Sequence, residues 1–373
     1  MAAAVFAAIL VYMAPIRGVD VSARSAIVLD GDSGRVLWEK NAQEECLIAS
    51  TTKIMTALVV LEQGTLEDTV EIPAEATGIE GSSMYLTAGE RLTVEDLLYG
   101  MMLSSGNDAA VALAIYVSGS PEAFAREMNR KAQALGLTHT GFANPNGLDQ
   151  EGNYSTAADL GRLAAAAMEN PDFRRIVSAK TYQCPGHTMT NHNKLLWQYE
   201  GAVGVKTGFT KRAGRILVGS AERKGRRLIS VTIHAPEDWR DHRRMLDYGF
   251  SQYVTETLVE AGQRVGAMPV MSGCCDTVSL RAAQGLDASV LPGESAEYRL
   301  LTGPFRYAPV EQGEILGTLQ VYLGRRLVGQ MPVYAGEQVL PLPQPPTLWQ
   351  RLQTIIFGEG TQGAGTCAKD SCP

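Results

Sequence analysis

The sequence predicts an α+β domain followed by a small all-β domain. Strand-like segments at both ends of the first 250 or so residues enclose a helical block. The segment 254–334 is rich in Val, Leu and Gly and has no long helical stripe. At 373 residues the chain also exceeds what one hydrophobic core usually fills, which favours more than one domain.

The first predicted element is a β-hairpin. Segments 25–30 and 35–38 are apolar and β-branched, and the turn-forming cluster 31–34 separates them. Strand character returns in three later segments, at 201–205, 216–221 and 228–235. We therefore expect one antiparallel sheet in which the N-terminal hairpin pairs with the late strands.

Between these strands the hydrophobic pattern is helical. Ile54, Leu58 and Leu61 recur at i, i+4 and i+7, which indicates a helix that begins near Ser50. Further helical segments are predicted over 92–117, 121–135 and 156–168. The sequence thus places a block of helices between the first and the last strands of the sheet.

Residues 1–23 form an apolar N-terminal segment, which we interpret as a signal peptide. Its run 2–15 is shorter than the roughly 20 residues of a membrane-spanning helix, and Val21-Ser22-Ala23 offers a small-x-small cleavage pattern before Arg24. Because no basic residue precedes the apolar core, a buried N-terminal helix stays open as the alternative. A signal peptide implies export to the extracytoplasmic face of the membrane or to the cell wall.

The predicted domains are residues 24–253 and 254–335, and residues 336–373 form a tail. The tail begins with a Pro-rich linker at 341–346, which favours an extended chain. Four apolar residues then recur at the spacing of a short amphipathic helix, Leu348, Leu352, Ile355 and Ile356. This helix is too short to span a bilayer, so we expect it either to lie at a membrane surface or to pack on the β domain.

Charge and residue types exclude several other classes of protein. The net charge of −7 argues against nucleic-acid binding, which needs a concentrated Lys/Arg face. The six cysteines contain no zinc-like C-x-x-C pair, and their pairing cannot be deduced from the sequence. The five histidines lie in no G-x-S-x-G or H-E-x-x-H context, so neither a Ser-His-Asp hydrolase nor metal catalysis is favoured. We expect His187 and His192 to lie at the surface or beside the site.

The first of three motifs that carry chemistry is Ser50-Thr51-Thr52-Lys53, at the start of the first helix. Positions three apart are neighbours on a helix, so the hydroxyl and the amine share one face. A Lys can take the proton of a Ser only if burial or nearby positive charge lowers its pKa. The N–H groups of the helix N-terminus favour the negative charge of a tetrahedral intermediate. Alone, the motif is also compatible with a helix cap and a solvated charge.

The other two motifs supply polar groups from a loop and a strand. Ser105-Gly106-Asn107 lies between helical segments and places a hydroxyl and a carboxamide two residues apart, suited to proton relay and to binding an amide. Lys206-Thr207-Gly208 continues a predicted strand, where the ammonium and hydroxyl can bind a carboxylate and the glycine admits a close backbone approach. Each of them alone is also compatible with a turn or a strand end.

Together the motifs form an S-x-x-K, S-x-N, K-T-G set, close to that of penicillin-binding proteins and class A β-lactamases, with Gly106 where the β-lactamase version has Asp. The sequence stretches 48–57, 103–110, 142–149 and 204–210, three of which contain the motifs, also look like those of the penicillin-binding proteins. Over about 23–334 the chain resembles the low-molecular-mass penicillin-binding proteins, the D-alanyl-D-alanine carboxypeptidase family. The resemblance implies a β-lactamase-like, penicillin-binding domain, with an antiparallel sheet and a helical subdomain, followed by an all-β domain.

The resemblance also implies roles for single residues. Ser50 is expected to be the acylated nucleophile, Lys53 its general base and Ser105 a member of the proton relay. The expected substrate-binding residues are Asn107, Lys206, Thr207, Gly208 and Phe209. Backbone N–H groups of Ser50 and Phe209 are expected to form the oxyanion hole. No metal or other cofactor is implied.

The implied substrate is a peptidoglycan stem pentapeptide that ends in D-Ala-D-Ala, with β-lactam antibiotics as covalent inhibitors. A β-lactamase stays open as a second hypothesis, although segment 144–155 contains Glu151 without the E-x-x-x-N pattern of class A enzymes. The additional β domain and tail also favour a carboxypeptidase acting on a polymeric wall. A non-catalytic scaffold that binds peptidoglycan is the third hypothesis, and the three intact motifs argue against it.

Overall fold

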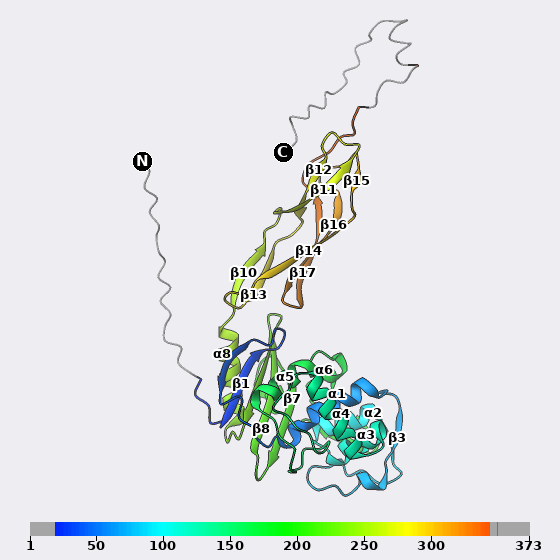
Figure 1. The fold of residues 1–373 in the computed structure, drawn as a ribbon, viewed down its shortest axis with the longest axis vertical. Coiled ribbons are helices and arrows are strands. Elements are labelled where there is room, and N and C mark those ends of the chain that lie inside the picture. The colour runs from blue at the N-terminus through cyan, green and yellow to red at the C-terminus, as the bar shows by residue number, and fades with distance from the viewer. Residues whose placement is uncertain (1–18, 344–348, 350–373) are drawn as a thin grey trace. The chain divides into compact units, whose positions relative to one another are not determined.

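A computed structural model describes residues 19–343 and Trp349 of the chain. The core of the predicted signal peptide, Cys367, Cys372 and the apolar stripe of the predicted tail helix lie outside the described residues. The chain divides into two compact units between Gln252 and Tyr253. The first mixes helices with a sheet and the second is built of strands, which confirms the predicted fold class (Figure 1).

The sheet of the first unit joins the two ends of that unit. Its five strands are β1 (Ser25–Asp30), β2 (Val36–Lys40), β7 (Ala202–Thr210), β8 (Gly214–Arg223) and β9 (Arg226–Ile233). Their order is β2-β1-β9-β8-β7, and every neighbouring pair is antiparallel. The N-terminal hairpin therefore pairs with the late strands, as the sequence predicted.

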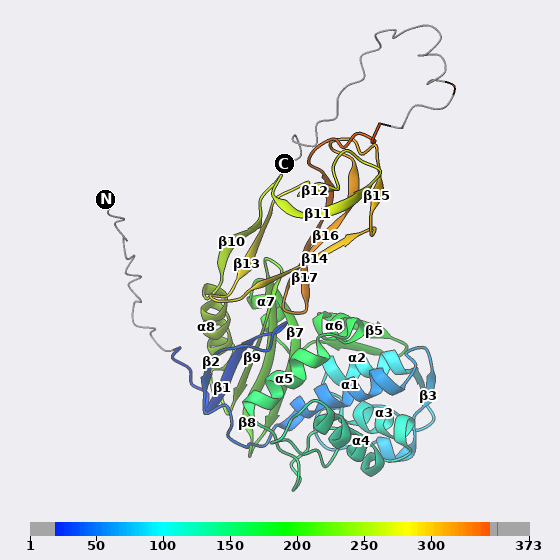
Figure 2. The ribbon, with the colours of Figure 1, turned by 45° about the horizontal axis from the view of Figure 1, so that its top comes forward.

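Helices cover both faces of this sheet, which explains why β1 and β9 are buried along their whole length. The helix α5 (Ala157–Ala167) packs on the face that carries Ile27 and Leu29, close to Gly161. The helix α8 (Asp238–Ser251) approaches Val28 through Gly249. Successive side chains of a strand point to opposite faces, so α5 and α8 lie on opposite sides of the sheet (Figure 2).

The remaining helices form the block that borders the site. They are α1 (Lys53–Gln63), α2 (Val94–Leu103), α3 (Asn107–Ser118), α4 (Pro121–Ala134), α6 (Pro171–Ser178) and α7 (Leu195–Gln198), and the 3-10 turn η1 (Ala49–Thr52) leads into α1. Every residue of α1 from Lys53 to Val60 is buried, so α1 is the central helix. The single helix predicted over 92–117 is instead two helices, because residues 104–106 form a loop that interrupts the helical conformation.

Short elements complete the first unit. They are the 3-10 turn η2 (Ala74–Ala76) and the paired strands β3 (Thr69–Glu71) with β4 (Arg91–Thr93) and β5 (Thr181–Cys184) with β6 (His187–Thr190).

Burial raises the pKa of the Cys46 thiol, which keeps it in the unreactive protonated form. In the described part of the chain, no helix is both long and apolar enough to cross a bilayer.

The second unit is made of strands around its own apolar core. The strands are β10 (Val254–Val259), β11 (Arg264–Met271), β12 (Thr277–Ala282), β13 (Leu286–Val290), β14 (Ala296–Thr302), β15 (Arg306–Tyr307), β16 (Ile315–Leu323) and β17 (Arg326–Ala335). Strands β10 and β13 pair with each other, and the other six form one sheet. Buried residues such as Leu319, Val321 and Val333 form its core, and Cys275 is disulfide-bonded.

Candidate active site

Ser50 and Lys53 meet where η1 passes into α1. Lys53 is fully buried, and its Nζ lies 3.0 Å from Ser50 Oγ. The same Nζ donates to Asn107 Oδ1 at 2.6 Å and to the backbone carbonyl of Asn146. The contacts with Asn107 and Asn146 therefore fix the amine next to the hydroxyl. The predicted neighbourhood of positions 50 and 53 is present in the structure.

The surroundings of Lys53 favour its neutral form. Burial is the larger cause and the charge of Lys206 the second, and together they hold the pKa of Lys53 well below its usual value. The carboxylate of Asp108 acts in the opposite direction and raises this pKa. Burial and the charge of Lys206 together lower this pKa more than Asp108 raises it, so the neutral amine is able to accept a proton from Ser50.

Two glycines let the backbone approach the Ser50 turn closely. A Cβ on Gly208 of β7 would lie 3.3 Å from Ser50 N and 3.2 Å from the Ile48 carbonyl oxygen. Gly147 has a φ of +87°, and a Cβ there would come within 2.0 Å of the Ala49 carbonyl oxygen. A side chain at Gly147 would therefore displace the turn at Ser50, and one at Gly208 would require a small shift of the same turn.

The loop between α2 and α3 supplies the second motif. Ser105 is buried with a φ of 63°, which turns the chain sharply between the two helices. Asn107 opens α3, and its carboxamide is held at both ends, because Oδ1 accepts from Lys53 and Nδ2 donates to the Glu80 carbonyl at 2.6 Å.

The neighbouring carboxylate, Asp108, fixes the segment that runs past this loop. It is buried and accepts hydrogen bonds from Ser83 Oγ, Met84 N and Leu86 N at 2.6, 3.0 and 3.1 Å. Asp108 lies in the first turn of α3. The structure shows that Asp108 holds the segment beside the pocket and acts on the charge of Lys53.

The third motif lies on β7. Lys206 is buried, and burial lowers its pKa to about 7. Its Nζ donates to the Thr207 carbonyl at 3.1 Å. Phe209 follows with 64% of its surface exposed, so its ring borders the opening. An amine with a pKa near 7 in a buried site gains its proton readily when an anion binds beside it.

A pocket of about 540 Å³ opens over these residues. Its lining residues are Ser50, Ser82, Ser105, Asn191, His192, Lys194, Thr207, Gly208, Phe209, Arg215, Ile216, Asp238 and Trp239. Five of the eight predicted site residues are in this lining, and Lys53, Asn107 and Lys206 are buried and joined to it by the contacts given above. Ser50 therefore lines the same pocket as residues of the other two motifs.

Sequence reasoning missed one side of the pocket. Arg215 of β8 forms a two-pronged ion pair with Asp238 at the start of α8, with Nη2 2.8 Å from each carboxylate oxygen and Nε 3.1 Å from Oδ2. The Arg215 guanidinium also lies 5.9 Å from the centre of the Trp239 ring. His192, which was expected at the surface or beside the site, also lines the pocket, and burial and the charge of Lys206 lower its pKa.

Comparisons with known proteins agree with this geometry. Residues 12–237 match the family model described as D-alanyl-D-alanine carboxypeptidase, and residues 253–340 match that of the penicillin-binding protein 5 C-terminal domain. The chain is 37% identical to D-alanyl-D-alanine carboxypeptidase DacC of Escherichia coli, over 86% of this chain and 84% of the relative. It is 34% identical to DacF of Bacillus subtilis, with 85% and 86% covered.

Solved structures show the same likeness. Penicillin-binding protein 5 from Haemophilus influenzae superposes with a TM-score of 0.62 at 30% identity, over 86% of this chain and 98% of the other. The Streptomyces K15 DD-transpeptidase gives a TM-score of 0.61 at 34% identity, but only 63% of this chain is covered, against all of the other. The serine-lysine pair, the pocket and these matches lead to one conclusion: the chain belongs to the D-alanyl-D-alanine carboxypeptidase family of serine peptidases.

Proposed function

We propose that this enzyme removes the terminal D-alanine from peptidoglycan stem pentapeptides through an acyl-enzyme on Ser50. The observation that carries the proposal is the buried amine of Lys53, which lies 3.0 Å from the Oγ of Ser50, a residue that lines the pocket. Because the pKa of Lys53 is depressed, its neutral amine can act as the base that a serine nucleophile requires.

In the acylation step, Lys53 takes the proton of Ser50 and Oγ attacks the carbonyl between the two D-alanines. The backbone N–H groups of Ser50 and Phe209 stabilise the oxyanion. As the tetrahedral intermediate collapses, the C–N bond breaks and the leaving amine of D-alanine receives the proton from Lys53 through the Ser105 hydroxyl. The products are free D-alanine and an ester on Ser50.

In the deacylation step, water attacks the ester while Lys53 accepts the water proton. The ester bond then breaks, Ser50 Oγ regains a proton from Lys53, and the shortened stem peptide leaves as a carboxylic acid that releases its remaining proton to the solvent. One base thus serves both halves of the reaction, and the chemistry of both uses only groups of this chain and water.

The third motif positions the substrate. The terminal carboxylate binds Lys206 and the Thr207 hydroxyl, and its negative charge favours the protonated form of Lys206. Asn107 holds the peptide amide beside Ser50. β-Lactam antibiotics carry a strained amide and a carboxylate, so we expect them to enter the same pocket and acylate the same hydroxyl.

We also propose that the enzyme is exported and held at the outer face of the membrane. The apolar segment 1–23 and the location of peptidoglycan outside the membrane support export, and the amphipathic pattern in 336–373 supports attachment. Fractionation tests this, because the full chain should sediment with membranes and a chain that ends at Pro343 should be released. Equal distribution of the two would contradict attachment.

The decisive experiment compares the native chain with Ser50→Ala after incubation with penicillin. Intact-mass spectrometry should show one adduct on the native protein and none on the variant, and equal thermal stability of the two would show that the variant is folded. Release of D-alanine from a pentapeptide identifies the carboxypeptidase. Rapid β-lactam hydrolysis without that release would favour a β-lactamase, and absence of any adduct would favour a binding scaffold.

A further inference from the structure

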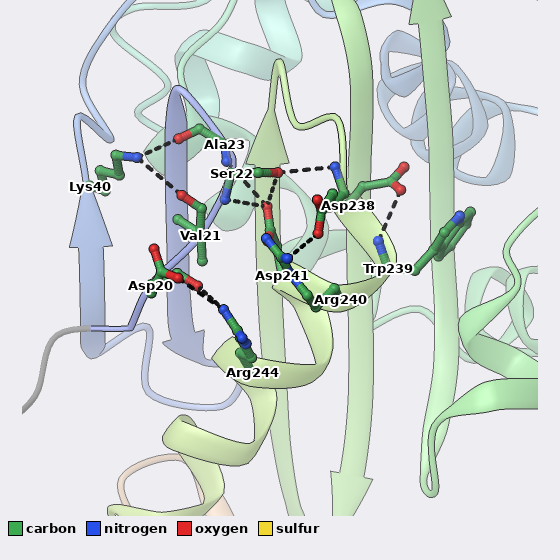
Figure 3. Close-up of polar contacts among 11 residues, drawn as sticks. Asp20, Val21, Ser22, Ala23, Lys40, Asp238, Trp239, Arg240, Asp241 and Arg244 are labelled. Atoms are coloured by element: carbon green, nitrogen blue, oxygen red, sulfur yellow. Dashed lines mark hydrogen bonds and ion pairs between the residues drawn. The ribbon is translucent and has the colours of Figure 1, made fainter.

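The first described residues are tied to the helix that borders the pocket (Figure 3). Asp241 of α8 is fully buried, and its Oδ2 accepts from Ser22 N at 2.9 Å, Ser22 Oγ at 2.6 Å and Ala23 N at 3.1 Å. Asp238 and Trp239, which precede it in the first turn of the same helix, line the pocket. A contact at Asp241 therefore acts close to the rim of the active site.

Hydrogen bonds on both sides of Ser22 extend this attachment. Arg244 donates to the carbonyl and the carboxylate of Asp20, at 3.0 and 3.1 Å. Lys40 of β2 donates to the carbonyls of Val21 and Ala23, at 3.3 and 2.7 Å. The segment 20–23 is thus held between the edge strand β2 and α8, and we call it the N-terminal clasp.

The clasp also completes the start of α8. Ser22 Oγ accepts a hydrogen bond from the backbone N–H of Glu237 at 3.0 Å. Glu237 is the residue before the helix, and α8 has no side-chain cap hydrogen bond at that position. The N–H groups at a helix start need acceptors, so the Ser22 hydroxyl performs this task from a distant part of the chain.

Asp241 depends on the clasp for its hydrogen bonds. Its Oδ2 takes the three donors of Ser22 and Ala23, and its Oδ1 accepts no hydrogen bond from any described residue. The nearest cation to Oδ1 is Arg240, at 3.8 Å. Without the clasp this carboxylate would lose all three of its hydrogen bonds from described residues, so the first turn of α8 would lose the contacts that hold it in place.

The cleavage pattern in the sequence conflicts with this arrangement. Cutting after Val21-Ser22-Ala23 would yield an enzyme that begins at Arg24 and lacks the whole clasp. We propose instead that the clasp stays on the mature enzyme, that the leader is cut before Asp20, and that Asp241 is a positioning residue for the pocket rim. Only the leader cut depends on the proposed export.

The rim explains why the position of α8 matters for the reaction. Asp238 holds Arg215 through two prongs, and Arg215 and Trp239 face the space above the third motif. A shift of the first turn of α8 would move Asp238 and release Arg215, while Lys53 would keep its contacts with Asn107 and Asn146, which involve no residue of α8. Loss of the clasp should therefore weaken substrate binding more than it slows the chemical step.

The first test is the N-terminus of the processed enzyme recovered from cells that export it, determined by intact mass and N-terminal sequencing. The expected start lies at or before Asp20. A start at Arg24 would overturn the proposal. This measurement requires no activity, so its result is independent of whether the enzyme releases D-alanine.

The second test compares the native chain with Asp241→Asn and with a chain that begins at Arg24. Both changes should lower Tm by about 5 °C and raise KM for the pentapeptide roughly tenfold, with kcat changed much less. The control is Leu246→Ala, which removes a fully buried side chain from the same helix, away from the pocket. An Arg24 chain with native Tm and KM would refute the clasp. An equal rise in KM in the control, at equal loss of Tm, would refute the positioning role.

If the native chain releases no D-alanine, the pentapeptide has no KM, and the proposed function fails on its own. The KM comparison is then replaced by the concentration dependence of acylation by penicillin. The clasp variants should still show weaker saturation at an unchanged limiting rate. An unchanged saturation curve for the Arg24 chain would contradict the clasp in that case too.

Discussion

Lys206 of β7 lowers the pKa of Lys53 of α1 through its charge, although the two lysines come from distant parts of the chain. Burial of Lys53 is the larger effect, and both favour the neutral amine. Under the proposed function the third motif therefore has a second role besides carboxylate binding, because the charge of Lys206 favours the neutral form of Lys53 that can act as the base.

Removing the charge of Lys206 should shift the pH dependence of acylation. In Lys206→Met the pKa of Lys53 rises, so the acidic limb of the acylation rate by penicillin moves to higher pH. The rate at its maximum should also fall, by roughly tenfold to a hundredfold, because a charged hydrogen bond to the carboxylate is lost. Lys211→Met is the control, since Lys211 is exposed just after β7 and should change neither property. A limb that moves to lower pH would contradict the coupling.

Asp108 should shift the same limb in the opposite direction. Its carboxylate raises the pKa of Lys53, so Asp108→Asn lowers that pKa and moves the acidic limb to lower pH. The variant also weakens the hydrogen bonds to Ser83, Met84 and Leu86, and Tm should fall by about 3 °C. The exposed Asp68→Asn serves as control. Movement of the limb in the same direction as in Lys206→Met would show that charge is not the cause.

The low pKa of Lys206 also predicts a pH-dependent cost in stability. The pKa is about 7 in the folded chain against an ordinary value of 10.5, so the folded state disfavours the charged amine. The cost is complete below pH 7 and disappears as pH rises toward 10.5. Lys206→Met removes it, so Tm should gain more at pH 6 than at pH 9. Calorimetry of both proteins at the two pH values measures this, and an equal gain at both would be the contrary result.

Gly208→Ala should slow acylation without unfolding the enzyme. The added methyl group meets Ser50 N and the Ile48 carbonyl at 3.3 and 3.2 Å, so β7 and the Ser50 turn must separate slightly. We expect the rate of penicillin acylation to fall by at least about tenfold, with Tm changed by no more than a few degrees. Gly303→Ala is the matched control in the β unit, where the nearest atom would be 3.8 Å away. A native rate in Gly208→Ala would show that the close approach is dispensable.

The elements that the sequence identified are those with strong local signals. The hairpin and the late strands carry β-branched runs, and they form the predicted sheet. The helix α8 was missed, although His242, Met245, Leu246 and Gly249 recur at i, i+3, i+4 and i+7 and are all buried. A histidine and a glycine are atypical members of an apolar stripe, and charged residues surround it. The structure explains the buried histidine, because Ser230 and Thr232 bond its two ring nitrogens at 2.8 and 3.0 Å.

Other parts of the site lie beyond what residue types can indicate. The carbonyl of Asn146 accepts from Lys53, and the N–H of Ser22 donates to Asp241. Backbone groups are the same at every position, so their use leaves no residue preference to detect. The ion pair of Arg215 with Asp238 joins β8 to α8, and only the paired register of the sheet brings these segments together. The three motifs were detectable because their chemistry depends on side chains at short spacing.

Gly147 and Gly208 both lie close to the backbone of the Ser50 turn. This close packing limits which mutations could make the enzyme resistant to an antibiotic. Under the proposed function, drug and wall peptide compete for the Ser50 hydroxyl, and bulk added at either glycine disturbs the backbone at Ile48–Ser50. Substitutions there should cripple both reactions together. Variants that spare the natural substrate while excluding the drug are expected instead among the side chains of the opening, where Phe209 and Trp239 face the incoming molecule.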